Sequence, residues 1–305
     1  MSQKTLFVSI ANYKDPEVLN TVQNLLENAS GDLDIHILVY SQIDLEDKSF
    51  DSLDSIPQVK HIKVDFREAK GVCWARKNAQ SYYNGEDYYL QIDSHIIFEK
   101  NWDRLLLEDH VRALQFGRKA ILTAYPCAYE FDTEGERYIP NKSPTRFDMN
   151  VVNIIPSAAA KFIDPSDDVE QEFFIAGGFL FTTGDFVTAV PYDEEIFFLG
   201  EEITLAIRAY TAGYFIFAPS KFICAHLYQV AQKEKRPVFW DRTEERARKI
   251  SWTLRDKTSK IKVQHICRGQ WFGKYGIQNH QLYLEYYSRL RAYDERVDLQ
   301  KVILP

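Results

Sequence analysis

The stretch that decides the fold is Tyr88-Tyr89-Leu90-Gln91-Ile92-Asp93-Ser94-His95, an apolar run that ends in an acid and a histidine two residues apart. The run predicts a strand. Because strands alternate faces, Asp93 and His95 at its carboxyl end would point the same way, into the crevice where open α/β sheets bind ligands. A carboxylate and an imidazole together suit Mn²⁺ or a related cation, and such an ion can hold a diphosphate. The competing interpretation is a strand that ends at a surface acid and an ordinary histidine.

Composition sets the class of protein. The 305 residues, 45% of them hydrophobic, are enough to bury a sizeable core. A net charge of −7 argues against a nucleic-acid binder, which would present a basic face. The first eleven residues carry one lysine and an apolar run too short for a secretion signal or a membrane span. The four cysteines form no C-x-x-C pair. We therefore expect a cytoplasmic globular protein that has no nucleic-acid partner and no membrane span.

Strand and helix signals alternate along the chain. Apolar strands are predicted at 5–11, 34–40, 59–64, 120–125 and 214–218. Helices are predicted from Asp15-Pro16-Glu17 to about Glu27, from Gly71 to Tyr82, over 102–116 and over 281–293. This alternation predicts a mostly parallel sheet flanked by helices. Residues 131–168 are rich in Pro, Asn, Ser and Asp, and are expected to be a long excursion that lines a site.

Two patterns in the second half have both a structural and a functional interpretation. Gly177 and Gly178 lie inside the strand-like run 172–181, where they indicate either a packing bulge or the close approach of a ligand to the backbone. Glu201 and Glu202 follow Gly200 at the start of a predicted helix. Acids in a first turn are often only complements to the helix dipole, and the alternative is contact with a substrate.

The carboxy-terminal part differs in charge from the rest. Residues 232–274 hold thirteen Lys and Arg against five Asp and Glu, a local balance of +8. This is either a solvated helix face or a surface beside a phosphate-bearing ligand. In the second case we expect some of these basic side chains to fold over the diphosphate, from among Lys233, Lys235, Arg236, Arg268 and Lys274.

Several landmarks resemble, in the same order, those of a known family. They are Ser9-Ile10-Ala11-Asn12-Tyr13-Lys14-Asp15-Pro16-Glu17, Ala75-Arg76, the block from Tyr89 to His95, Leu122-Thr123-Ala124-Tyr125-Pro126, Gly200-Glu201-Glu202 and Ala225-His226-Leu227-Tyr228. Together they resemble the polypeptide α-N-acetylglucosaminyltransferase family, whose best-known members add GlcNAc to hydroxyproline. The order of motifs also resembles the mucin-type polypeptide GalNAc-transferases. The resemblance covers most of residues 4–280 and implies a GT-A glycosyltransferase fold with a Rossmann-like central sheet.

The resemblance also implies a role for each matching residue. The ligands of Mn²⁺ (or Mg²⁺) would be Asp93, His95 and His226. Glu201 and Glu202 would be catalytic residues that bracket the sugar and the acceptor. The residues that would contact the nucleotide-sugar lie on four segments: Ala11, Asn12, Tyr13, Arg76, Gln91, Asp93, Ser94, Gly177 and Gly178. Of these, residues 11–13 would lie near the uridine, and the two glycines would lie against the sugar.

The resulting prediction is a transferase core over residues 1–230 with a basic, aromatic-rich extension over 231–305 packed on it. The reaction implied is metal-dependent, retaining transfer of GlcNAc from UDP-GlcNAc to a hydroxyl of a polypeptide or glycan. Two alternatives stay open: a transferase that builds capsule or lipopolysaccharide glycans with another UDP-sugar, and a non-catalytic sugar-nucleotide-binding protein. Val72-Cys73-Trp74 and Ile277-Gln278-Asn279-His280 depart from the family pattern and leave the acceptor open. The oligomeric state is also open.

Overall fold

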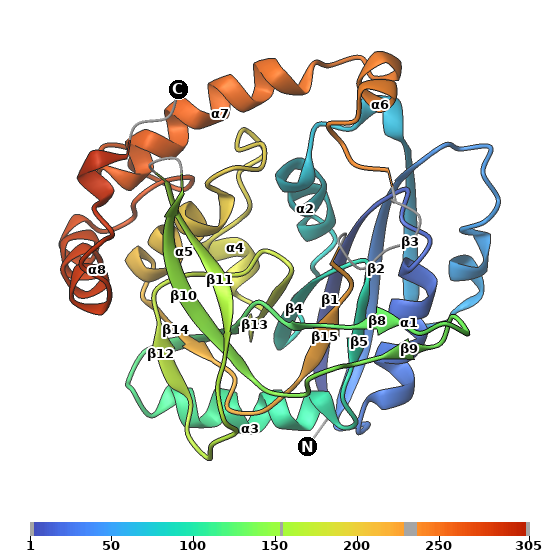
Figure 1. The fold of residues 1–305 in the computed structure, drawn as a ribbon, viewed down its shortest axis with the longest axis horizontal. Helices are drawn as coiled ribbons and strands as arrows, with labels where there is room; N and C mark the ends of the chain where they lie inside the picture. Colours follow the sequence, from blue (N-terminus) through green and yellow to red (C-terminus); the bar gives the residue numbers. More distant parts are fainter. Residues whose placement is uncertain (1–2, 153–154, 229–236, 303–305) are drawn as a thin grey trace.

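An eight-stranded sheet forms the centre of the protein in a computed structural model that describes residues 3–152, 155–228 and 237–302. Its strand order is β12-β14-β6-β13-β4-β1-β2-β3 (Figure 1). The strands are β1 (Lys4–Tyr13), β2 (Leu33–Ile43), β3 (Val59–Asp65), β4 (Tyr88–Asp93), β6 (Lys119–Thr123), β12 (Glu170–Glu172), β13 (Phe179–Thr183) and β14 (Tyr214–Ala218). Strands β4, β1, β2 and β3 are mutually parallel, whereas β13 and β12 run antiparallel to their neighbours. The mostly parallel α/β sheet is therefore confirmed.

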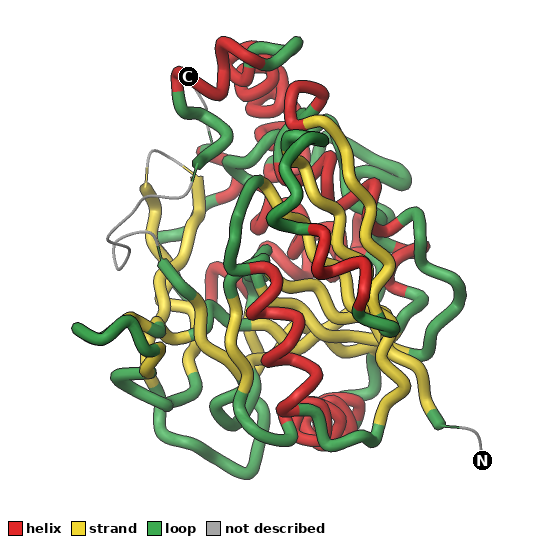
Figure 2. Tube along the Cα trace, turned by 90° about the vertical axis from the view of Figure 1, so that its right-hand side faces the viewer, coloured by secondary structure: helices red, strands yellow, loops and turns green. Residues whose placement is uncertain are grey.

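Helices surround this sheet, as Figure 2 shows from the side. They are α1 (Val18–Asn28), α2 (Val72–Gln80), α3 (Trp102–Leu114), α4 (Phe186–Ala189), α5 (Glu201–Thr211), α6 (Arg242–Ala247), α7 (Trp252–Cys267) and α8 (His280–Tyr293), with 3₁₀ turns at Asp51–Ser55, Phe66–Glu68 and Leu299–Lys301. The helix α1 buries Val18, Val22 and Leu25, which recur at helical spacing and so form one apolar face. None of the helices in the described ranges has the length and apolar character needed to cross a membrane.

A small second sheet, which the sequence pattern did not reveal, lies beside the end of β4. It contains β5 (Ile96–Phe98), β15 (Cys224–His226) and β7 (Cys127–Ala128). Strand β15 runs antiparallel to β5 with His226 opposite Ile96, and the Leu227 N–H donates to the His95 carbonyl at 3.0 Å. This register places His226 next to His95 although 130 residues separate them along the chain.

Two expectations about local structure are wrong. Residues 131–168 are not an irregular excursion: they contain part of the hairpin β8 (Glu130–Phe131)–β9 (Arg137–Tyr138) and the hairpin β10 (Thr145–Val152)–β11 (Ile155–Phe162). Along β10 the buried Phe147 and Met149 alternate with polar residues, a period-2 pattern that predicts a strand, whereas the distal half of β11 is exposed and shows no such pattern. Gly177 and Gly178 lie in the turn before β13 and not inside a strand.

The carboxy-terminal helices pack against α5. The Tyr286 hydroxyl donates to the Phe173 carbonyl at 2.6 Å, and Lys262 pairs with Asp193 at 2.6 Å in the loop that precedes α5. In Figure 1 the helix α7 crosses the top of the molecule above α5 and α2. The predicted boundary at residue 230 lies in 229–236, outside the described residues, and the division into core and extension stays a prediction.

Candidate active site

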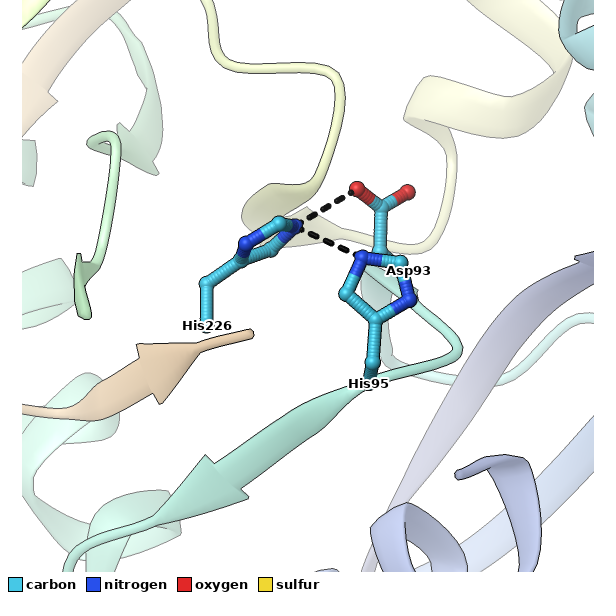
Figure 3. Close-up of side chains that lie close together, drawn as sticks. All are labelled: Asp93, His95 and His226. Atoms are coloured by element: carbon cyan, nitrogen blue, oxygen red, sulfur yellow. Dashed lines mark hydrogen bonds and ion pairs between the residues drawn. The ribbon is translucent and has the colours of Figure 1, made fainter. Parts of the chain in front are cut away.

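Three ligand-type side chains converge at the carboxyl end of β4. Asp93, His95 and His226 each offer an atom, and these atoms all lie within 4.8 Å of one another. The two histidines face each other with 2.9 Å between their Nε2 atoms, and His226 Nε2 lies 3.3 Å from Asp93 Oδ2 (Figure 3). Asp93 ends β4, His95 begins the turn into β5, and β15 brings His226 against both. The convergence that the Asp-x-His pattern predicts is therefore present.

The arrangement of these atoms fits a divalent cation. Two imidazole nitrogens bound to one ion at about 2.1 Å and at right angles would lie about 3 Å apart, close to the observed separation. A set of one carboxylate and two imidazoles is intermediate in softness, which favours Mn²⁺ or a similar ion over Mg²⁺. Gly178 leaves room for this set, because a Cβ there would lie 2.5 Å from Asp93 Oδ2.

The Asp93 carboxylate is held ionised by its surroundings. Burial opposes ionisation, but the hydrogen bond with His226 and the charges of Arg76 and the histidines outweigh it and hold the pKa of Asp93 well below its usual range. Arg76 Nη2 donates to Asp93 Oδ1 at 2.8 Å, which leaves Oδ2 directed at the histidines. The carboxylate is thus charged and oriented for a cation.

Two pockets meet at this triad. The first, of about 390 Å³, is bounded by the ends of β1 and β2 and by the segment Pro237–Trp240. The second, of about 490 Å³, lies between the Gly177–Gly178 turn, the start of α5 and the hairpin β10–β11. Both are lined by Asp93 and His226 together with Val72, Phe198 and Tyr228. A ligand that spans both pockets would therefore pass over the three converging side chains.

The first pocket is largely aromatic. Ala11 and Tyr13, at the end of β1, line one wall, and Phe239 and Trp240 line another. The Tyr13 and Phe239 rings lie 5.5 Å apart, and the Tyr13 hydroxyl donates to Glu244 Oε2 at 2.8 Å. This bond joins the core to the segment that begins at α6. Flat aromatic walls suit a planar heterocycle.

Glu201 is tied to Arg76 at the floor of the second pocket. Arg76 Nη1 and the Tyr192 hydroxyl both donate to Glu201 Oε1, the latter at 2.8 Å. Arg76 thereby bridges Asp93 and Glu201, and both its side chain and that of Glu201 are buried. Glu201 therefore lines the second pocket and takes part in a buried ion pair, and its role in catalysis stays a prediction.

Glu202 occupies the opposite wall of the same pocket. Its Oε2 accepts from the Tyr125 hydroxyl and its Oε1 accepts from the Gly177 N–H at 2.8 Å. Burial raises the pKa of Glu202 to about 7 although these two hydrogen bonds favour the ionised form. The group would change charge near neutral pH, at a position that also fixes the glycine turn.

Two predicted donor-binding residues lie behind the pocket walls. Asn12 is fully buried, donates to Ser41 Oγ at 3.1 Å and accepts from the Asp15 N–H at 3.0 Å. Gln91 is also fully buried and donates to the Gly177 carbonyl and the Tyr192 hydroxyl, both at 2.7 Å. In this arrangement both side chains support the site and are not in contact with its open volume. Ser94 does line the first pocket, beside Asp15.

The expectation that some basic side chains of the extension cover the diphosphate stays a prediction. Arg268 and Lys274 are not among the residues that line either pocket, and Lys233, Lys235 and Arg236 lie outside the described residues. The extension instead supports the loop before α5: the Phe197 N–H donates to Ser259 Oγ at 2.9 Å. The ion pair of Lys262 with Asp193 supports the same loop, so at least one basic side chain of the extension neutralises a protein carboxylate.

Sequence reasoning also missed three side chains that shape the site. Tyr192 and Asp15 had no ligand-type pattern around them, and Tyr125 was visible only as part of the motif 122–126. The sequence predicts Asp15 as the N-cap of a helix, but α1 begins at Val18, and Asp15 Oδ1 accepts from the Glu17 N–H at 3.0 Å in the turn before it. Its other oxygen contacts His95, a relation that only the tertiary structure discloses.

Comparison with solved structures establishes the fold. GalNAc-T7, crystallised with UDP, GalNAc and Mn²⁺, aligns with 96% of this chain at a TM-score of 0.62 and 14% identity, so the fold is that of the GT-A glycosyltransferases. The aligned part spans 57% of the GalNAc-T7 chain. TarS from S. aureus in complex with UDP-GlcNAc aligns with 97% of this chain and 83% of its own, at a TM-score of 0.48 and 11% identity.

The sequence profile of the Glycosyltransferase (GlcNAc) family matches residues 55–286, which is most of the chain. The chain therefore belongs to this family. No curated protein sequence is similar enough to be matched. The narrower resemblance to enzymes that modify hydroxyproline stays a prediction.

Proposed function

We propose that this glycosyltransferase moves GlcNAc from UDP-GlcNAc to a hydroxyl group of a polypeptide or glycan, with a bound divalent cation and with retention at the anomeric carbon. The observation that carries the proposal is the meeting of two pockets at Asp93, His95 and His226. One pocket has the aromatic walls that a base requires, and the other has the carboxylates that a sugar requires. The diphosphate that joins the two halves of a UDP-sugar would lie over the triad.

The donor would be held from both sides of the triad. Ala11 and Tyr13 would contact the uridine, and Mn²⁺ (or Mg²⁺) held by Asp93, His95 and His226 would neutralise charge on the diphosphate. Arg76 stays charged between Asp93 and Glu201 and adds to the positive potential at the leaving group. Gly177 and Gly178 line the second pocket, where they would let the sugar lie close to the backbone.

The two glutamates would act on the sugar and the acceptor through hydrogen bonds. Glu201 Oε1 already accepts from Arg76 and Tyr192, and both Glu202 oxygens accept hydrogen bonds, so neither carboxylate is arranged as a free nucleophile. The acceptor oxygen would then form its bond to the anomeric carbon on the face that the phosphate leaves. The sugar–phosphate bond breaks, and the acceptor proton passes to an oxygen of the departing diphosphate.

A donor panel tests this proposal. The purified chain with Mn²⁺ should hydrolyse UDP-GlcNAc slowly without acceptor and should leave GDP- and CMP-sugars intact. Turnover of a different UDP-sugar alone would favour the surface-glycan alternative. Turnover only of a non-UDP donor would overturn the proposal, and metal-dependent UDP binding without any turnover would favour a non-catalytic binding protein.

Substitution of the glutamates separates catalysis from helix stability. Glu201→Gln and Glu202→Gln should each lower kcat roughly 10²-fold, because each removes a charge beside the bond that breaks. If the acids served only the helix dipole, each change would cost about 0.3–1 kcal/mol of stability and leave kcat unaltered. The readouts are kcat from product formation and the free energy of unfolding from denaturant titration.

A further inference from the structure

Asp15 lies directly behind the converging side chains, in the loop between β1 and α1. Its carboxylate is buried, and Oδ2 is 2.6 Å from His95 Nδ1. The Ser94 hydroxyl donates to the same oxygen at 2.9 Å, and Oδ1 accepts from the Glu17 N–H at 3.0 Å. The backbone N–H of Asp15 donates in turn to Asn12 Oδ1 at 3.0 Å. The position of this carboxylate is therefore fixed from several directions, and it is not one of the three ligand groups that converge.

The contact with Asp15 decides which nitrogen of His95 carries the proton. An ionised carboxylate only accepts hydrogen bonds, so a neutral His95 in this contact carries its proton on Nδ1. Its Nε2 then presents a lone pair, and Nε2 is the atom that faces His226 Nε2 at 2.9 Å. The opposite tautomer would direct an N–H at the place where a cation binds and would leave two acceptors, Nδ1 and Oδ2, 2.6 Å apart.

We propose that Asp15 is a positioning residue that fixes His95 as the Nδ1-protonated tautomer and thereby raises the affinity of the site for a divalent cation. The inference rests on the metal site of the proposed function and adds a residue that is not one of the three ligand groups, although it lines the first pocket beside Ser94. Ligating histidines commonly donate their second N–H to a carboxylate, and loss of such a partner weakens metal binding about 10–100-fold. Asn12 and Ser94 both form hydrogen bonds with Asp15, so they would support metal binding indirectly by fixing its position.

A purely structural role for Asp15 makes a different prediction. If the residue only organises the start of α1, its replacement would lower stability and leave the affinity of the folded protein for metal unchanged. The two roles are separated by Asp15→Asn, which retains size and the capacity to accept from Glu17. The amide can also turn its NH₂ group toward Nδ1, which stabilises the wrong tautomer.

The experiment is a titration of the full chain with Mn²⁺ alone, followed by electron paramagnetic resonance of the free ion. Asp15→Asn should raise the Kd at least tenfold relative to the unmodified chain. Asp103→Asn is the matched control: Asp103 is a fully buried carboxylate that accepts from the Ser30 N–H at 2.7 Å and the Ser30 hydroxyl at 2.8 Å, away from the triad. The Kd of the Asp103→Asn chain for Mn²⁺ should stay within twofold of the value for the unmodified chain.

Nitrogen-15 spectra of the histidine side chains in the unmodified, metal-free chain give a second readout that needs no variant of Asp15. With His95 assigned through His95→Gln, the expected signature is a protonated Nδ1 and a bare Nε2. A bare Nδ1 on His95, or a folded Asp15→Asn chain with unchanged Mn²⁺ affinity, would overturn the role of Asp15. Absence of Mn²⁺ binding by the unmodified chain, with the expected tautomer present, would instead overturn the metal site of the proposed function.

Discussion

Gly178→Ala tests how strongly metal binding and catalysis depend on the position of the Asp93 carboxylate. A Cβ at this position would lie 2.5 Å from Asp93 Oδ2 and 3.1 Å from Asp93 Cγ. Ordinary contacts require about 3.5 Å, so the carboxylate or the glycine turn would have to move by roughly 0.5–1 Å. Arg76 and His226 hold the carboxylate on its other sides, and this limits how it can yield.

A displacement of that size is enough to disrupt catalysis. Misplacement of a reacting or binding group by about 1 Å can cost 10²-fold in rate. Gly178→Ala should therefore raise the Kd for Mn²⁺ at least tenfold and lower kcat/KM for UDP-GlcNAc by roughly 10²-fold. The assays are metal titration of the free enzyme and initial rates over a range of donor concentrations. Unchanged Mn²⁺ affinity in the folded variant would refute the reasoning.

Gly184→Ala is the matched control because Gly178 and Gly184 flank the two ends of β13. A Cβ at Gly184 would lie 2.0 Å from the Glu86 carbonyl oxygen, at the end of the strand remote from Asp93. This overpacking should lower the free energy of unfolding by about 1–3 kcal/mol. The Mn²⁺ affinity of the folded fraction should not change. The pair thus separates a loss of stability from a loss of the site.

Three further outcomes are expected. Ser259→Ala removes the acceptor of the buried Phe197 N–H, so it should lower the free energy of unfolding by about 1–3 kcal/mol and raise the Kd for UDP. An unchanged Kd would show that the extension does not contribute to donor binding. The pKa of Glu202 is raised from 4.5 to about 7, so the folded state holds its proton more tightly than the unfolded state does. This preference stabilises the fold fully below pH 4.5, and the stabilisation is lost as the pH rises through 7. The free energy of unfolding of Glu202→Gln, measured by urea titration at each pH, should lack that loss. Removal of metal with a chelator should weaken UDP binding at least tenfold, and Mn²⁺ should restore it; equal UDP affinity before and after chelation would show that the donor is held without metal.

The features that could be predicted from the sequence are those that depend on residues close together along the chain. Alternation of apolar strands and helices gave the parallel sheet. The Asp-x-His pattern predicted that Asp93 and His95 lie together, although His95 belongs to the bend after β4 and not to the strand. The start of α5 at Glu201 followed from apolar spacing. Each of these depends on neighbours within one or two turns of the chain, which a single sequence displays.

The remainder depends on long-range pairing. The small sheet that carries His226 has strands of two or three residues, too short for any periodic signal. In the hairpin β10–β11 only β10 alternates polar and apolar residues, and the distal half of β11 is exposed. The buried positions of Asn12 and Gln91, and the contact of Asp15 with His95, follow from how separate segments pack, which neither composition nor spacing records.

The central claim is that Asp93, His95 and His226 hold a cation under the diphosphate of the donor. Its most direct test is the position of the metal in crystals of the chain soaked with UDP and Mn²⁺, located by anomalous scattering. The account predicts one manganese at about 2.0–2.3 Å from Asp93 Oδ2, His95 Nε2 and His226 Nε2, bridged to the diphosphate, with the uracil in the pocket beside Tyr13. Manganese bound elsewhere, or UDP held in this pocket with no metal at the triad, would contradict it.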